Sequence, residues 1–170
     1  GNIDEGTTTM DFLPDERARG ITIAAAAASL NWQDKELHLI DTPGHIDFTA
    51  EVERSLRAIE GAVVIFSAVE GVEAQSEKVW RQADKYKVAK IAFINKLDRI
   101  GASFEETIKQ INAKFNNCAL PLQLPIGRED DFSAIIDVLN AEKVSFSGNS
   151  GEEIHREELN AEQKELQEKA

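Results

Sequence analysis

Hydrophobic and polar positions along this chain follow two patterns: short continuous apolar runs, and longer stretches with apolar residues at helical spacing. The continuous runs predict buried strands over residues 62–66 and 90–94, and shorter apolar stretches predict further strands over residues 37–41 and 122–126. The helically spaced stretches predict helices over residues 47–60, 74–86 and 103–115. Ser103 is followed three residues later by Glu106, as in a capping box, so we expect the third helix to begin there.

This alternation of strands and helices predicts an α/β fold with a mostly parallel sheet, right-handed crossovers and flanking helices. In such sheets, ligands bind beyond the carboxyl ends of the strands. Asp41 and Asn95 fall at two of these ends. The residues that follow Asp41 and Asn95 are therefore the first candidates for a functional site.

The pattern changes after residue 118. Residues 147–151 are rich in glycine and serine and are expected to form a flexible loop. Residues 157–170 are charged and favour a surface helix. We therefore divide the chain into a first part, residues 1–118, and a second part, residues 119–170, and find no internal repeat.

Composition and charge narrow the function classes. The 170 residues are 42% hydrophobic and 29% charged, which is typical of a soluble globular protein, and no apolar run approaches the ~20 residues of a membrane span. The net charge is −12, of which residues 121–170 supply −7 (12 Asp/Glu against 5 Lys/Arg). Without a Lys/Arg stripe, direct binding to DNA is not expected. The single cysteine, Cys118, rules out an internal disulfide and is expected to be a structural thiol.

The stretch Asp41–His45, with the sequence Asp-Thr-Pro-Gly-His, carries the strongest chemical signal. A carboxylate at a strand end can reach a metal ion, and Gly44 lets backbone approach a phosphate closely. His45 follows with an imidazole that titrates near neutral pH. The alternative is an ordinary Pro-Gly turn in which Asp41 caps the next helix.

A second motif, Asn95-Lys96-Leu97-Asp98, follows the strand that ends at Ile94. The Asp98 carboxylate can accept two hydrogen bonds from the adjacent N–H donors of guanine, a pair that adenine lacks on that edge. Asn95 can donate to a ring nitrogen, and the stem of Lys96 can lie over the base. In isolation this tetrapeptide would be a strand followed by a turn, but two such motifs at the ends of two strands favour a nucleotide site.

A third stretch, Arg19–Ile23, precedes these motifs and contains Thr22, whose hydroxyl is a hard oxygen of the kind that Mg²⁺ prefers. The same stretch is also compatible with the simple start of a strand. A metal hydrolase built on Asp41, His45 and Asp47 is a weaker reading, because no further His or carboxylate cluster lies at metal-binding spacing.

Together, Arg19–Ile23, Asp41–His45 and Asn95–Asp98 resemble the switch I, switch II and guanine-reading motifs of translational GTPases. Residues 47–56, 79–86 and 122–127 narrow the resemblance to elongation factor G. The resemblance implies a P-loop GTPase-type fold. It also implies that residues 119–170 begin the α+β subdomain inserted into the GTPase domain of that family.

The resemblance further implies GTP and GDP as ligands, Mg²⁺ as cofactor, and the ribosome, including its stalk proteins, as partner. It also implies a monomeric protein that is located in the bacterial cytoplasm or, alternatively, in the mitochondrial matrix. It makes His45 the catalytic residue that orients the attacking water, with Mg²⁺ held by Thr22 and, through water, by Asp41. The residues that it assigns to GTP are Thr22, Asp41, Thr42, Pro43, Gly44, His45, Asn95, Lys96 and Asp98.

Other readings remain open. The G-x-x-x-x-G-K-[ST] phosphate loop is absent: Gly1–Thr8 resembles it but has Thr7 in place of lysine, and we interpret residues 1–12 as the end of switch I. We therefore expect a fragment of the parent GTPase, truncated at both ends and inactive by itself. The alternatives to translocation are a paralogue active in ribosome recycling or ribosomal protection, or a ribosome-interaction module that does not hydrolyse nucleotide.

Overall fold

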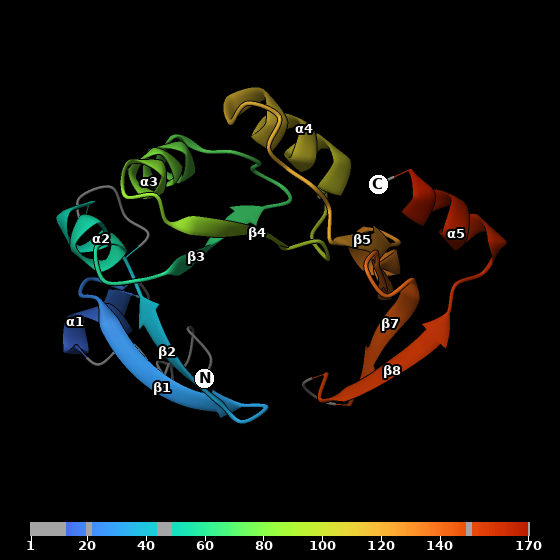
Figure 1. Cartoon of the computed structure of the whole chain (residues 1–170), viewed down its shortest axis with the longest axis horizontal. Helices are drawn as coiled ribbons and strands as arrows, with labels where there is room; N and C mark the ends of the chain where they lie inside the picture. Colours follow the sequence, from blue (N-terminus) through green and yellow to red (C-terminus); the bar gives the residue numbers. More distant parts are fainter. Residues whose placement is uncertain (1–12, 20–21, 44–48, 149–150, 170) are drawn as a thin grey trace. The chain divides into compact units, whose positions relative to one another are not determined.

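A computed structural model describes residues 13–19, 22–43, 49–148 and 151–169 of the chain (Figure 1). The chain divides into two compact units, residues 1–64 with 74–91 and residues 65–73 with 92–170. The division passes through strands β3, Gly61–Ser67, and β4, Ala89–Asn95. The expected α/β class is confirmed.

The first unit begins with helix α1, Pro14–Arg19, followed by a hairpin of strands β1, Ala26–Trp32, and β2, Lys35–Asp41. The strands pair antiparallel, from Ala26 opposite Asp41 to Trp32 opposite Lys35. The two turn residues, Gln33 and Asp34, have φ of 45° and 60°, as the twist of a two-residue hairpin turn requires. The sequence pattern predicted β2 but missed β1, so β2 pairs with an antiparallel neighbour that was not expected.

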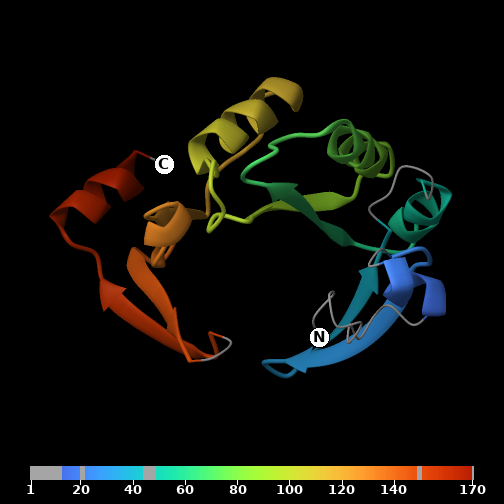
Figure 2. The same ribbon diagram turned by 180° about the vertical axis from the view of Figure 1, so that it is seen from behind.

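The core of the first unit lies between helices α2, Thr49–Leu56, and α3, Ala74–Lys85, which run side by side (Figures 1 and 2). Its buried side chains are Val52, Leu56, Ala83 and Val88. The described part of α2 ends four residues before the predicted end at Glu60. The amides of Arg57 and Ala58 bond to the carbonyls three residues before them, which tightens the last turn and ends the helix.

Strands β3 and β4 are hydrogen-bonded neighbours joined through α3. Gly61 lies beside the carbonyl of Ala89, so the strands start together. The amide of Ala68, just after β3, donates to the carbonyl of Asn95, the last residue of β4, at 2.8 Å. The two strands therefore start and end together, as the predicted parallel pairing requires. Their expected burial on both faces is wrong, because Val63, Ile65, Ile91 and Phe93 are all more than half exposed.

In the second unit, helix α4, Phe104–Lys114, starts at Ser103, whose hydroxyl accepts a hydrogen bond from the Glu106 amide, as predicted. Ile111 is fully buried on this helix, and the rings of Phe66 and Phe115 pack 6.3 Å apart.

The rest of the second unit is a four-stranded antiparallel sheet in the order β5-β6-β7-β8. The strands are β5, Gln123–Ile126; β6, Ala134–Asp137; β7, Glu142–Ser147; and β8, Glu153–Glu158. A 3₁₀ turn, η2, Glu129–Asp131, joins β5 to β6. The last helix, α5, Ala161–Glu168, begins later than predicted, because Asn160 caps it and residues 157 and 158 complete β8. The boundary at residue 118 stays a prediction.

No helix among the described residues is long and apolar enough to cross a membrane.

Candidate functional site

The expected phosphate-side residues Thr22, Asp41, Thr42 and Pro43 all belong to the first unit. Asp41 is the last residue of β2 and pairs with Ala26, so Thr22 lies four residues before the partner of Asp41, at the same end of the hairpin. Thr22, Asp41 and Thr42 are half-buried, and Pro43 is fully buried. Thr22 and Asp41, a hydroxyl and a carboxylate, therefore belong to stretches at the same end of the hairpin, and the buried Pro43 follows Asp41 by two residues.

Gly44 and His45 lie outside the described residues, as do Gly20 and Ile21 of the switch I motif. Their roles in contacting phosphate and orienting water stay predictions.

The segment that carries Thr22 is held by a residue that the sequence did not single out, Glu16 of α1. Its side chain is completely buried. Oε1 accepts hydrogen bonds from the amides of Ile23 and Ala24, both at 2.9 Å, and Oε2 accepts one from the amide of Leu13 at 2.8 Å. One carboxylate therefore satisfies three backbone donors and ties α1 to the two residues after Thr22.

The hydrogen bond between Glu16 and Leu13 could have been predicted from the neighbouring sequence. Pro14 takes the first helical position, where its missing N–H costs nothing, and Glu16 at the third position reaches back to the amide before the helix. The bonds to Ile23 and Ala24 join residues seven and eight positions apart across a loop, for which no sequence pattern exists.

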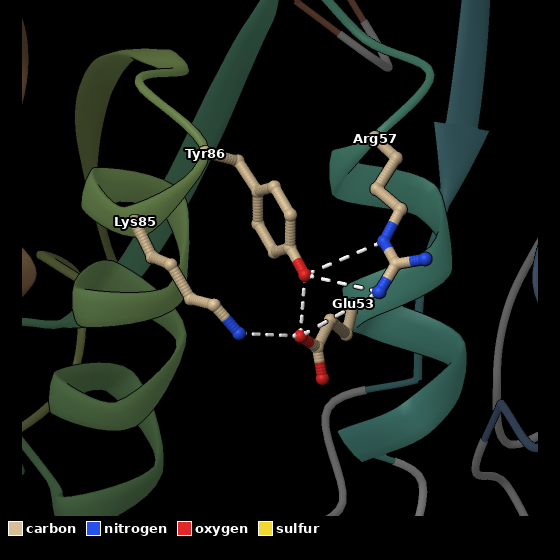
Figure 3. A network of polar contacts seen from close by, with 4 residues as sticks. All are labelled: Glu53, Arg57, Lys85 and Tyr86. Atoms are coloured by element: carbon tan, nitrogen blue, oxygen red, sulfur yellow. Dashed lines mark hydrogen bonds and ion pairs between the residues drawn. The ribbon is translucent and has the colours of Figure 1, made fainter.

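Helix α2, which follows the Asp41–His45 stretch in sequence, is tied to α3 by four polar side chains around the Tyr86 hydroxyl (Figure 3). The hydroxyl donates to Glu53 Oε1 at 2.5 Å and accepts from Arg57 Nε and Nη2 at 3.3 and 3.2 Å. Lys85 Nζ donates to the same Glu53 oxygen at 2.9 Å.

This network shifts the ionisation of its members. The hydrogen bond from Tyr86, followed by that from Lys85, holds the pKa of the Glu53 carboxyl below its ordinary value. The pKa of Lys85 is raised, first by its hydrogen bond to Glu53. Both directions favour the charged forms, so Glu53 and Lys85 form an ion pair at neutral pH beside the Tyr86 hydroxyl.

The expected base-reading residues Asn95, Lys96 and Asp98 belong to the second unit; Asn95 is the last residue of β4, and Lys96 and Asp98 follow it. All three are exposed or half-exposed. Asn95 Oδ1 accepts a hydrogen bond from the Lys96 amide at 2.9 Å, which leaves the Nδ2 group of Asn95 as its donor to a ligand. Lys96 has φ of 63°, and its Nζ lies 3.7 Å from Glu70 Oε2.

Neighbouring backbone fixes the start of this loop. The Asn95 carbonyl accepts from the Ala68 amide, and the Ala68 carbonyl accepts from the Ser103 amide, both at 2.8 Å. The first residue of the motif and the residue that caps α4 are therefore joined through a single residue after β3. Asp98 therefore lies in the loop that follows the carboxyl end of β4, as we expected.

Thr22 and Asp41 are the two residues expected to hold Mg²⁺. Among the described residues, no group of three or more His, Cys, Asp and Glu side chains could hold a metal ion. Thr22 and Asp41 offer two hard oxygens, which suits an ion that takes its remaining ligands from phosphate and water. When bound, Mg²⁺ would neutralise charge on the phosphates.

Comparisons with known proteins agree with the motifs. The model of the family described as elongation factor Tu GTP binding domain matches residues 1–167. Elongation factor G 2 of Syntrophus aciditrophicus (strain SB) is 51% identical over 150 residues, which are 88% of this chain and 22% of that protein. Elongation factor G 2 of Syntrophomonas wolfei subsp. wolfei is 49% identical over 164 residues, 96% of this chain and 24% of that protein.

Among solved structures, the crystal structure of a protein from Thermus thermophilus matches 99% of this chain and 25% of that chain, with a TM-score of 0.89 and 27% identity. The chain thus spans about a quarter of the length of these relatives. The resemblance to elongation factor G that the motifs indicated is confirmed. The chain belongs to the elongation factor Tu GTP-binding domain family.

Proposed function

We propose that the protein carrying this chain is a translational GTPase of the elongation factor G type, which hydrolyses GTP and couples hydrolysis to ribosomal translocation. The family match over residues 1–167 carries the proposal. It is supported by the position of Asp41 at the end of β2 and of Asn95 at the end of β4. The two relatives named elongation factor G 2 support the same class.

In this proposal Asn95–Asp98 bind the guanine base, and Thr22 together with Asp41–His45 binds Mg²⁺ and the phosphates. Asp98 accepts the two guanine donors, Asn95 donates to a ring nitrogen through Nδ2, and the stem of Lys96 covers the base. Thr22 binds Mg²⁺ directly and Asp41 through water. Thr42 and Pro43 position the turn before Gly44, whose amide contacts the γ-phosphate.

Catalysis would consist mainly of positioning and charge stabilisation, because phosphoryl transfer leaves little covalent chemistry to the protein. His45 would orient the attacking water when the ribosome binds. The expected partners are the ribosome and its stalk proteins.

The proposal is tested by replacing His45 in the intact protein. His45→Ala should leave GTP and GDP affinity within about twofold of wild type, because the imidazole acts on water and not on the nucleotide. Ribosome-stimulated hydrolysis should fall by about 10²-fold or more, the range for loss of a group that acts in the transition state. His155→Ala, on β8, is the matched control and should keep wild-type turnover.

Stimulated turnover that is unchanged in His45→Ala would refute the role of His45. Wild-type protein that neither binds guanine nucleotides nor responds to ribosomes would refute the proposed function itself.

A further inference from the structure

Glu129, which lies outside every motif, contacts the base-reading loop at two places. Its backbone amide donates to the carbonyl of Leu97 at 2.9 Å, and its side-chain Oε1 accepts from the amide of Gly101 at 2.8 Å. Leu97 and Gly101 stand on either side of Asp98. One residue therefore holds the loop before and after the carboxylate that would read guanine.

The loop's own backbone bonds do not connect these two points directly. Among the described residues, the amide of Arg99 bonds to the Lys96 carbonyl at 3.2 Å, and the amide of Ala102 bonds to the Arg99 carbonyl at 3.1 Å. These bonds form successive turns, and each spans only three positions of the chain. Among the described residues, the two hydrogen bonds of Glu129 add a link between Leu97 and Gly101 that these turns do not make, and so restrain the width of the loop around Asp98.

The segment that presents Glu129 is itself tightly constrained. Gly127 has φ of 81°, and a Cβ there would lie 1.9 Å from the carbonyl oxygen of Asp131, so only glycine fits. Glu129 has φ of 53°, an uncommon conformation for a residue with a long side chain. The amide of Phe132 bonds to the Glu129 carbonyl at 3.1 Å, and that of Ser133 bonds to the Ile126 carbonyl at 3.1 Å.

This turn joins β5 to β6, the first two strands of the antiparallel sheet. Their register, from Gln123 opposite Asp137 to Ile126 opposite Ala134, fixes both ends of the turn. Ala134 and Ile136, on β6, are buried. The packing of the antiparallel sheet therefore positions Glu129. The two hydrogen bonds of Glu129 in turn hold the loop around Asp98.

We propose that Glu129 is a positioning residue for guanine recognition, which holds the Leu97–Gly101 loop so that the Asp98 carboxylate meets both donors of the base. The inference rests on the proposed function, because it takes Asp98 as the reader of guanine. It adds a residue from the antiparallel sheet to the specificity of the nucleotide site and makes that sheet part of base selection.

The decisive measurement compares GDP with inosine diphosphate, whose base keeps the ring N–H but lacks the exocyclic amine. Asp98 accepts two hydrogen bonds from the first and one from the second, so the affinity ratio reports how well the carboxylate is placed. Wild-type intact protein should prefer GDP by about tenfold or more, the effect of one lost hydrogen bond to a charged acceptor.

Glu129→Asp is the main variant, because it keeps the charge and tolerates positive φ but withdraws the carboxylate from Gly101. We expect its GDP affinity to fall about tenfold and its preference for GDP over inosine diphosphate to shrink at least about threefold. Glu129→Gln keeps an acceptor oxygen at the same reach and should restore most of the preference. Asp130→Asn, the exposed neighbour in the same turn, should behave as wild type.

Glu129→Ala serves as a second disruptive variant, with the thermal unfolding midpoint of each protein recorded alongside. An unchanged ratio in Glu129→Asp and Glu129→Ala, beside a clear wild-type preference for GDP, would overturn this inference alone. Equal losses of affinity for both nucleotides would also overturn it, because they would indicate a purely structural role. Wild-type protein that binds GDP and inosine diphosphate equally well would overturn the role of Asp98 as reader of guanine, and this inference with it, whereas the proposed function itself falls only if guanine nucleotides do not bind and ribosomes have no effect.

Discussion

Replacement of Glu16 should release the segment that carries Thr22. The buried carboxylate of Glu16 accepts hydrogen bonds from Leu13, Ile23 and Ala24. A hydrogen bond to a charged group contributes about 1.5–3 kcal/mol. Taking the low end for the two bonds to Ile23 and Ala24, Glu16→Ala should make local opening of this segment easier by about 3 kcal/mol, or about 100-fold.

Hydrogen exchange of single backbone amides in the intact protein measures this opening directly. In Glu16→Ala, the Ile23 and Ala24 amides should exchange about 100-fold faster than in wild type. Glu16→Gln should be intermediate, because its single side-chain oxygen can serve the Ile23–Ala24 pair or Leu13, but not both. Asp15→Asn removes the same charge from an exposed position in the same helix and is the control. Unchanged exchange at Ile23 and Ala24 in Glu16→Ala would refute the reasoning.

Two further predictions concern stability. Tyr86→Phe removes the hydroxyl that contributes most to lowering the Glu53 pKa. A lowered carboxyl pKa adds stability above the ordinary value of 4.5, and this stability is lost as the pH falls through the lowered value. The thermal unfolding midpoint of Tyr86→Phe should therefore depend less on pH below 4.5 than that of wild type. An identical pH dependence would contradict the role of the hydroxyl. Ser103→Ala removes the cap that accepts from Glu106 and should cost about 1 kcal/mol in urea unfolding, whereas Ser103→Asp should stay close to wild type. Equal losses in both variants would show that the cap is not the cause.

The sequence predicted the elements whose apolar residues are large and regularly spaced. Strands β3 and β4 and helices α3 and α4 lie within one or two residues of their expected bounds. Strand β1 was missed, because its first three residues are all alanine and its two large apolar residues, Leu30 and Trp32, stand apart on either side of Asn31. Such a stretch has neither a continuous run of large apolar residues nor a helical repeat, the two patterns on which the expectation relied.

The motif residues of the candidate site could also be predicted, because their chemistry resides in their own side chains and they follow strands that the pattern locates. Glu16 and Glu129 could not. Each acts on backbone amides of a segment that is distant in sequence. A backbone donor is the same in every residue, so no residue type at the far end signals the contact.

The same reasoning explains why these supports lie outside the motifs. Both supports bind backbone amides next to motif residues, at Ile23, Ala24 and Gly101, and so do not use the side chains of Thr22, Asp41 and Asp98. The amides that remain in partly buried surroundings need acceptors, and leaving one unpaired costs about 1–3 kcal/mol. A carboxylate has two oxygens and can accept several such bonds at once. Glu16 meets this need beside Thr22, whereas the bond from the Gly101 amide to Glu129 is exposed and holds the loop near Asp98 without a burial penalty. Variants that remove these carboxylates should therefore affect nucleotide binding more than their distance from the motifs in sequence would suggest.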